Sequence, residues 1–180
     1  MQVAVAVAVF GCASGSYATA QEVPWVANGA DPQGTRFSPA ATITPENVDQ
    51  LQPAWIYRTG EQEPDFATVK PAALEVTPLV SDGVMYIGTP LGRVIALDAA
   101  TGEELWLFDP EIRRDIRYGD FASRGVSMWI DPDASAHSRC AKTIFIANAQ
   151  SQLWALDAAD GRPCSDFGNE GWIDLTEGLR

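Results

Sequence analysis

Disulfide formation between cysteines is the reaction that residue types and spacing in this sequence indicate most directly. The 180-residue chain has three cysteines, Cys12, Cys140 and Cys164. In an oxidising compartment, two cysteines that approach each other form a disulfide. Residues 143–148 and 152–157 are typical of two strands joined by a tight turn, and folding that hairpin brings Cys140 and Cys164 toward the same end. We therefore predict a Cys140–Cys164 disulfide; two unpaired buried thiols are the alternative.

The N-terminus predicts export, which would place the chain in such a compartment. Residues 3–10 form an apolar run that is too short to span a bilayer, which needs about 20 residues. Ala18 and Ala20 then give the A-x-A spacing of a signal-peptidase site, so we predict a signal peptide over residues 1–20. No positive charge precedes the run, and lipid attachment at Cys12 or a buried strand are the alternatives. Cleavage after Ala20 would remove Cys12 and leave two cysteines, and the expected location is the periplasm.

The charge balance argues against a nucleic-acid partner. Lys and Arg number 12 against 24 Asp and Glu, a formal net charge of −12. Phosphates would be repelled by such a surface. The expected partners are therefore small molecules or other proteins.

A repeated stretch identifies the elements that must position any site. Residues 94–106 and 153–164 share the core ALDAA-x-G. Around the first copy, four short runs rich in β-branched and aromatic residues alternate with turns that contain Gly, Pro or Asp. They span residues 75–80, 84–89, 93–98 and 103–108. Four short antiparallel strands in a repeated unit predict a β-propeller blade, with Trp106 on its outer strand packing against a neighbouring blade.

The second unit is less regular. Residues 124–130, 143–148 and 152–157 supply three strands, and Cys164 falls near the position that Trp106 takes in the first unit. Residues 132–139 form an inserted polar loop that lengthens the repeat beyond the usual 40–50 residues. The only histidine, His137, belongs to this insert, so we interpret it as a surface residue.

A lone outer strand precedes both units. Residues 51–61 resemble the fourth strand of a blade, with Trp55 in the role of Trp106, yet no first three strands come before them. Such a strand completes the last blade of a closed ring. Two blades cannot close a ring of four to eight, so we expect the chain to be the N-terminal fragment of a longer protein.

Four ordered segments together resemble the pyrroloquinoline-quinone (PQQ)-dependent dehydrogenases. The segments are residues 29–61, 75–110, 123–129 and 161–175. The similarity is greatest to the membrane-associated quinoprotein glucose dehydrogenase group. It implies an all-β fold, an eight-bladed β-propeller in the full-length family, of which this chain would hold about two blades and the ring-closing N-terminal strand. Residues 21–180 would be the N-terminal part of that propeller domain.

The resemblance assigns cofactor contacts to three residues. Glu75, in EVTPL, matches a family glutamate that hydrogen-bonds PQQ, and Arg124, in SRGV, matches an arginine near the quinone. A planar, always charged guanidinium suits a cofactor with three carboxylates and an ortho-quinone. Asp120 stands where the glucose branch has a cofactor-linked histidine. A strand-end solvated carboxylate for Glu75 and a surface ion pair for Arg124 are the structural alternatives.

Two departures separate the chain from the alcohol branch of the family. Methanol and ethanol dehydrogenases have two adjacent, mutually bonded cysteines on the PQQ plane, and Tyr118 and Gly119 stand at those positions. A threonine that contacts PQQ in that branch is replaced by Ala147. The missing cysteine pair argues against the alcohol branch, and Ala147 cannot donate a hydrogen bond to the cofactor.

The resemblance also implies the reaction. Ca²⁺ would polarise a PQQ carbonyl, an Asp general base would take the hydroxyl proton of a sugar or alcohol, and hydride would move to the carbonyl. Electrons would then pass to a quinone or cytochrome acceptor, with the protein peripherally associated with the membrane. The catalytic base and the Ca²⁺ ligands are expected beyond Arg180, so the fragment should contribute cofactor contacts only.

Two non-enzymatic functions are the alternatives. One is a periplasmic propeller scaffold of the outer-membrane assembly type, and the other is a propeller that binds wall sugars. Neither explains the GTRFSP segment at residues 34–39, Glu75 or Arg124.

Overall fold

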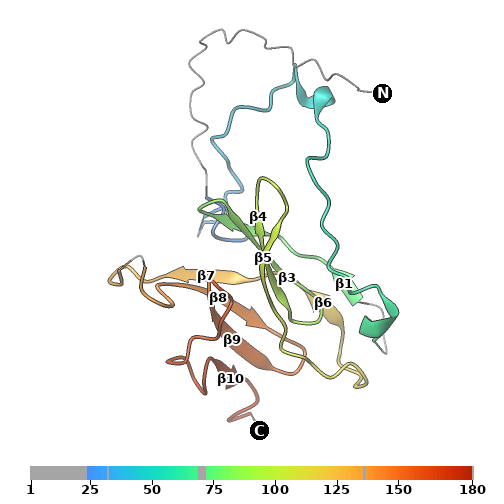
Figure 1. Cartoon of the computed structure of the whole chain (residues 1–180), viewed down its shortest axis with the longest axis vertical. Coiled ribbons are helices and arrows are strands. Elements are labelled where there is room, and N and C mark those ends of the chain that lie inside the picture. The colour runs from blue at the N-terminus through green and yellow to red at the C-terminus, as the bar shows by residue number, and fades with distance from the viewer. Residues whose placement is uncertain (1–23, 32, 69–71, 136, 180) are drawn as a thin grey trace, which may run out of the picture.

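The computed structural model describes residues 24–31, 33–68, 72–135 and 137–179 (Figure 1). The predicted signal peptide therefore lies outside the described residues. Within these ranges the chain is built from strands and loops, with two short 3-10 helices, η1 (Val48–Gln50) and η2 (Pro64–Phe66), and no α-helix. No helix in the described part of the chain is long and apolar enough to cross a membrane.

The first four-stranded sheet, blade 1, confirms the predicted unit. Its strands are β2 (Leu79–Ser81), β3 (Val84–Gly88), β4 (Val94–Asp98) and β5 (Glu104–Phe108), paired antiparallel in chain order. The first strand begins four residues later than residue 75, where we had predicted it. Pro78, which has no N–H to donate to a ladder, directly precedes it.

The repeated ALDAATG sequence forms the turn between β4 and β5. Asp98 Oδ1 accepts hydrogen bonds from the backbone N–H groups of Ala100 (2.9 Å) and Thr101 (2.8 Å) and from the Thr101 hydroxyl (3.0 Å). Gly102 then adopts φ +74°, which a glycine takes without a steric penalty. The motif is thus architectural, as its composition predicts.

The second four-stranded sheet, blade 2, contains a strand that we had not predicted. Its strands are β7 (Ser127–Ile130), β8 (Lys142–Ala147), β9 (Gln152–Asp157) and β10 (Trp172–Asp174), in the order β10-β9-β8-β7. The outer-strand position beside β9 is occupied by two separate pieces of chain. Pro163 forms a bridge to Leu156, and the Cys164 N–H donates to the Ala155 carbonyl at 2.8 Å, before a loop leads to β10.

The core lies between the two blades. Leu79, Ile144 and Leu156 are fully buried there. The partly buried rings of Phe108, from blade 1, and Trp154, from blade 2, pack against this core. The centroids of the two rings are 5.0 Å apart. This face-to-face packing of sheets is the contact that a propeller repeats around its ring, and the all-β propeller architecture is confirmed.

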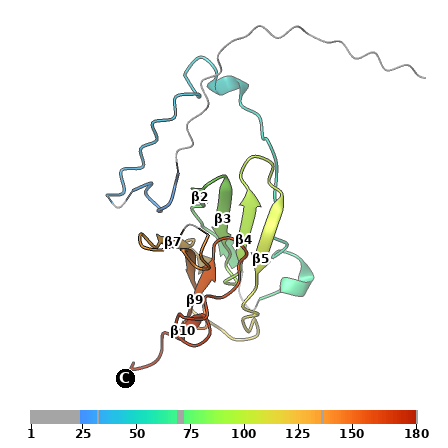
Figure 2. The ribbon, with the colours of Figure 1, turned by 60° about the vertical axis from the view of Figure 1, so that its left-hand side comes forward.

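The segment before blade 1 contacts it through several residues, among them Trp25, Trp55 and Glu61. Trp25 pairs with Val80, exchanging backbone hydrogen bonds of 2.8 and 2.9 Å, and so covers the free edge of β2, which sequence reasoning did not foresee. Trp55 donates its indole N–H to the Ala99 carbonyl at 3.2 Å. Between these contacts the chain runs as an open loop away from the sheets (Figures 1 and 2).

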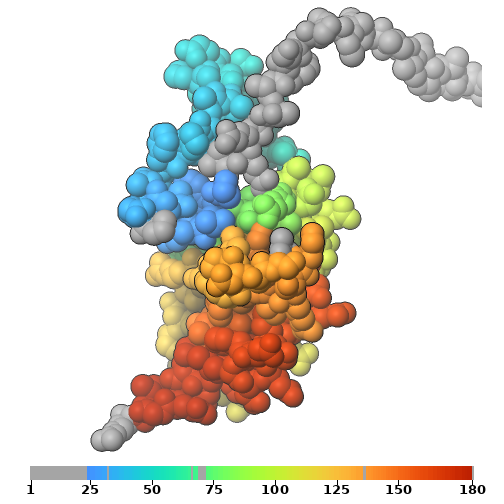
Figure 3. Space-filling view, turned by 90° about the vertical axis from the view of Figure 1, so that its left-hand side faces the viewer, coloured from blue at the N-terminus to red at the C-terminus, as the bar shows by residue number. Residues whose placement is uncertain are grey.

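The inserted loop of blade 2 lies on the surface, as predicted. His137 is exposed there, and orange-coloured atoms of this part of the chain lie in the middle of the face shown in Figure 3. The interpretation of His137 as a surface residue is therefore confirmed.

Candidate functional site

A short parallel strand pair brings two of the predicted site residues together. β1 (Ala72–Leu74) pairs with β6 (Phe121–Ser123), with Leu74 opposite Ser123. Glu75 and Arg124 are the next residue on each strand. They form an ion pair in which Arg124 Nη1 lies 2.8 Å from Glu75 Oε2. Residues 49 positions apart (124 − 75) thus meet because of the sheet register.

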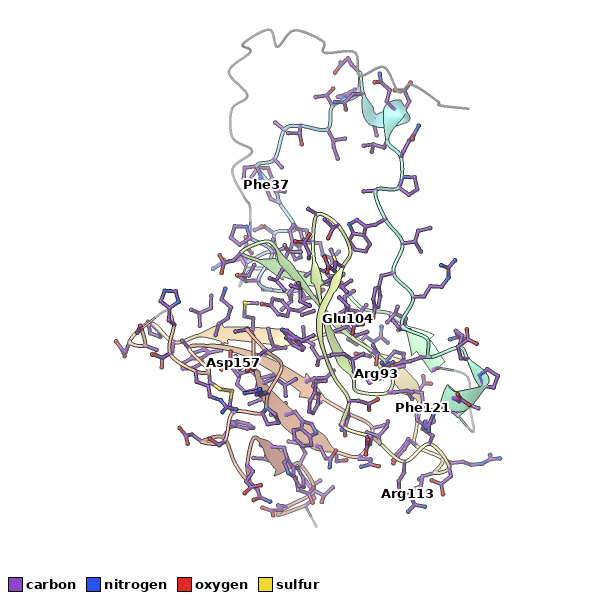
Figure 4. The ribbon with its side chains drawn as sticks, in the orientation of Figure 1. Phe37, Arg93, Glu104, Arg113, Phe121 and Asp157 are labelled. Carbon is purple, nitrogen blue, oxygen red and sulfur yellow. A yellow bond between two sulfur atoms is a disulfide. The ribbon has the colours of Figure 1, made fainter. Side chains whose placement is uncertain are left out.

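Buried neighbours fix the strand that carries Arg124. Phe121, labelled in Figure 4, is fully buried in a small core with Leu91 and Ile112. Tyr118 packs edge-on against its ring, with 5.4 Å between the ring centroids. Val126, two residues after Arg124, is buried in the core between the blades. The arginine is therefore a solvent-facing residue held between anchored positions.

The pair itself is open to solvent. The side chain of Arg124 is 84% exposed and that of Glu75 is 45% exposed. An exposed ion pair contributes about 0–1 kcal/mol to stability, so its part in holding the fold is small. The guanidinium has five N–H donors, and most of that donor surface faces outward. Such a pair can bind a planar anionic ligand.

The third predicted residue, Asp120, lies apart from the pair. It directly precedes β6, whereas Arg124 directly follows that strand, and its side chain is exposed. The structure thus brings together Glu75 and Arg124 but not Asp120. Asp120 stays a tentative prediction as a cofactor contact.

Tyr118 has a packing role at the position where the alcohol branch has a cysteine. Its hydroxyl donates to Gln150 Oε1 at 3.1 Å, which ties the β5–β6 connection to the β8–β9 turn of blade 2. Desolvation raises the pKa of Tyr118 above its usual value of 10. Tyr118 thus helps to hold the connection that leads to β6.

A hollow of about 530 Å³ lies elsewhere in the fold. Its lining includes Tyr86, Trp106, Arg139 and Lys142. Neither Glu75 nor Arg124 lines it, and three of its basic side chains have partners: Lys142 is paired with Asp82, Arg162 is paired with Asp160, and Arg139 donates to the Pro163 carbonyl. We therefore assign the candidate site from the chemistry of the Glu75–Arg124 pair and not from the size of a hollow.

The two cysteines form the predicted disulfide. Cys140 and Cys164 are bonded, with their Cα atoms 6.0 Å apart. Cys140 precedes β8, and Cys164 lies beside Ala155 of β9, as Trp106 lies beside Ala96 in blade 1. The hairpin of β8 and β9 brings them to one end of the blade, so the prediction is confirmed.

Comparison with known proteins decides what kind of chain carries this pair. The sequence model of the family described as "PQQ: Glucose/ethanol/alcohol dehydrogenase, beta-propeller domain" matches residues 25–180. The chain belongs to this family of PQQ-dependent dehydrogenases. The recognition from sequence is therefore confirmed, and the Glu75–Arg124 pair lies inside the matched region.

Individual relatives include both sugar and alcohol enzymes. The chain is 32% identical to quinoprotein glucose dehydrogenase A of Acinetobacter calcoaceticus, over 88% of this chain and 22% of that protein. It is 35% identical to the glycerol dehydrogenase large subunit of Gluconobacter oxydans, over 86% of this chain and 21% of that protein. It is also 35% identical to 1-butanol dehydrogenase (cytochrome c) of Thauera butanivorans, over 77% and 18%. The chain thus spans about a fifth of the length of these relatives.

A solved structure agrees with the fold. The quinohemoprotein alcohol dehydrogenase from Comamonas testosteroni superposes with a TM-score of 0.68 at 28% sequence identity, covering 88% of this chain and 20% of that one. Within the described ranges, no group of three or more His, Cys, Asp or Glu side chains could hold a metal ion.

Sequence reasoning missed two features near the site. The parallel pairing of β1 with β6 creates the site, but two three-residue strands, AAL and FAS, carry no recognisable signal. The buried Arg93 side chain contacts Glu61 and Asp109, at 3.5 and 3.3 Å, and so joins the N-terminal segment to blade 1. A charged residue next to a strand predicted to be buried could have indicated this cluster, because charged side chains are rarely buried unless they are paired.

Proposed function

We propose that the chain is the N-terminal part of a PQQ-dependent dehydrogenase that oxidises a hydroxyl group of a glucose-like sugar or of another alcohol. The observation that supports this is the exposed Glu75–Arg124 pair at the ends of β1 and β6, in a chain of this family. Because the pair does little for stability, its charges are available to a ligand.

The chemistry of the pair fits the cofactor. PQQ has three carboxylates and an ortho-quinone, and a guanidinium binds carboxylate and quinone oxygens through parallel N–H donors. Arg124 would donate to the cofactor, while Glu75 would hold the guanidinium in orientation and accept a hydrogen bond. When bound, PQQ would supply the carbonyl that takes up the electrons of the substrate. Asp120 is proposed as a third contact.

The remaining parts of the machinery are proposals that extend beyond the described residues. We propose that the catalytic base and the Ca²⁺ ligands come from other parts of the protein, which accords with the short span of the chain relative to its relatives. We further propose a quinone or cytochrome acceptor and a periplasmic location with peripheral association with the membrane.

The substrate class is proposed from one sequence difference. Tyr118 and Gly119 take the positions of the adjacent cysteines of the alcohol branch, and Tyr118 is committed to packing against Phe121. This favours a sugar, glucose-like in class, over a primary alcohol. The relatives, which include glucose, glycerol and 1-butanol dehydrogenases, support the wider class of hydroxyl compounds.

The test is a dye-linked oxidation assay of the protein at its natural length, reconstituted with PQQ and Ca²⁺. D-glucose, glycerol and 1-butanol are the substrates, and protein without PQQ is the control. We expect PQQ-dependent dye reduction, fastest with D-glucose. Faster oxidation of 1-butanol would overturn the sugar assignment, and no PQQ-dependent oxidation of any substrate would favour the non-enzymatic scaffold.

A further inference from the structure

Gly125, the residue after Arg124, lies in unusually close contact with the segment that carries Glu75. A Cβ atom added to Gly125 would lie 3.1 Å from the Thr77 carbonyl oxygen and 3.2 Å from Val76 Cγ2. Both contacts are tighter than ordinary van der Waals packing, and one is to backbone, which cannot turn aside as a side chain can. A side chain here would require the two segments to move apart by a few tenths of an ångström, which a glycine does not.

The backbone at Gly125 also has a conformation that favours glycine. Its φ is +126°, a region that residues with a Cβ rarely adopt. The Gly125 N–H donates to the Ser123 hydroxyl at 3.2 Å, so the residues on each side of Arg124 are tied to each other. Ser123 and Val126 are themselves buried.

This close packing determines the direction in which the side chain of Arg124 extends from the backbone. Between the end of β6 and the start of β7 the backbone at Gly125 passes close to Val76 and Thr77, the two residues that follow Glu75. The distance between the segments therefore decides whether Arg124 Nη1 reaches Glu75 Oε2, at 2.8 Å. The glycine sets that distance without touching either charged group.

We propose that Gly125 is a positioning residue for cofactor binding: it holds Arg124 beside Glu75, in the geometry that binds PQQ. This inference rests on the proposed function of the pair. Adding one methyl group at Gly125 should push the β6–β7 connection away from Thr77 and carry the guanidinium out of place, although no group that contacts the cofactor is removed.

The experiment is a PQQ titration of the protein at its natural length, followed by the absorbance or fluorescence of PQQ. The variants are Gly125→Ala, Arg124→Ala and the double variant, with Gly83→Ala as the matched control. Gly83 also has a positive φ, +74°, but an added Cβ there meets nothing within 4 Å. The control therefore introduces backbone strain without displacing a neighbouring segment.

We expect Gly125→Ala to weaken PQQ binding by about tenfold, within the loss that follows from removing a charge-assisted contact. Gly83→Ala should leave it unchanged. In the Arg124→Ala background, Gly125→Ala should weaken binding by less than about twofold, because its effect passes through the arginine. A purely structural glycine would cause the same loss in both backgrounds.

Ser123→Ala keeps the test available if Gly125→Ala does not fold. It removes only the hydroxyl that accepts the Gly125 N–H, and it should weaken PQQ binding by about two- to fivefold with Arg124 present and not in its absence. Equal losses in both backgrounds, or wild-type affinity in both variants, would overturn the positioning role. If Arg124→Ala itself binds PQQ as tightly as the wild type, the assignment of the pair fails, and the positioning role fails with it.

Discussion

The indole of Trp106 in blade 1 donates its Nε1 hydrogen to the carbonyl of Ala158 in blade 2, at 3.1 Å. The same relationship joins Trp55 to Ala99, at 3.2 Å. In both cases the acceptor belongs to the turn encoded by the ALDAA-x-G repeat. The repeated sequence is therefore a docking site for a tryptophan from the segment before it. Trp106 lies on β5, whereas Trp55 lies in residues 51–60, which form no strand in the structure, so the outer strand that we predicted over residues 51–61 is not formed here.

Glycine in that turn is required by the tryptophan that covers it. A Cβ on Gly161 would lie 2.5 Å from Trp106 Cε3, and φ is +73° there. We expect Gly161→Ala to lower the free energy of unfolding by about 2–4 kcal/mol, from overpacking added to backbone strain.

Gly83→Ala introduces the same backbone strain at a positive φ, but its Cβ would meet open space. We expect it to lower the free energy of unfolding by about 1 kcal/mol. Urea unfolding measures both variants. Equal losses would show that the tryptophan contact does not limit this position.

The disulfide should contribute substantially to the stability of blade 2. It joins residues 24 positions apart, and closing a loop of this size is typically worth about 2–4 kcal/mol. Replacing both Cys140 and Cys164 by Ser should lower the free energy of unfolding by that amount. Peptide mapping of protein purified without a reductant should recover the two cysteines in one cross-linked peptide, whereas recovery of both as free thiols would contradict the pairing.

Glu61 should make stability fall as pH rises. Its side chain is 3% exposed, and burial, followed by the nearby Asp109 carboxylate, raises its pKa above the usual 4.5, although Thr89 and Arg93 act in the opposite direction. The folded state therefore holds this proton at pH values where the unfolded state has released it. From about pH 4.5 up to the raised pKa, Glu61 should progressively reduce stability.

Glu61→Gln should remove that slope, since the amide does not titrate. Urea unfolding at a series of pH values from 4 to 8 measures it, and Glu103→Gln, at an exposed position, is the control that should keep the wild-type slope. An unchanged slope in Glu61→Gln would show that other groups cause the pH dependence.

The repeat was predictable from sequence because local signals specify it. Alternating β-branched and aromatic runs predict β3, β4 and β9 to within one residue, and Asp98 and Gly102 predict the turn. The β10 strand was missed because it is only three residues long and follows a loop that interrupts the outer position of blade 2. Local patterns do not encode such an interruption.

The candidate site was predictable only in part. Glu75 and Arg124 were identified by their match to family motifs, but their contact depends on the parallel pairing of β1 with β6, two short strands 49 residues apart in register. Parallel pairing joins distant segments without a hairpin turn to reveal it. The close approach of Gly125 to Thr77 is likewise a tertiary feature that composition does not show.

The most direct measurement of the central claim is the affinity for PQQ of the protein at its natural length, with and without Arg124. Arg124→Ala should weaken binding by about 10- to 150-fold, the loss of a charge-assisted contact worth about 1.5–3 kcal/mol. Arg124→Lys should restore it only in part, because an ammonium lacks the planar fork.

Arg113→Ala is the matched control for this titration. Arg113, labelled in Figure 4, is also an exposed arginine with a carboxylate partner at 2.8 Å, Asp115. Its removal should leave the PQQ affinity unchanged. Wild-type affinity in a folded Arg124→Ala variant, or an equal loss in Arg113→Ala, would contradict the account and return the Glu75–Arg124 pair to the status of a surface ion pair.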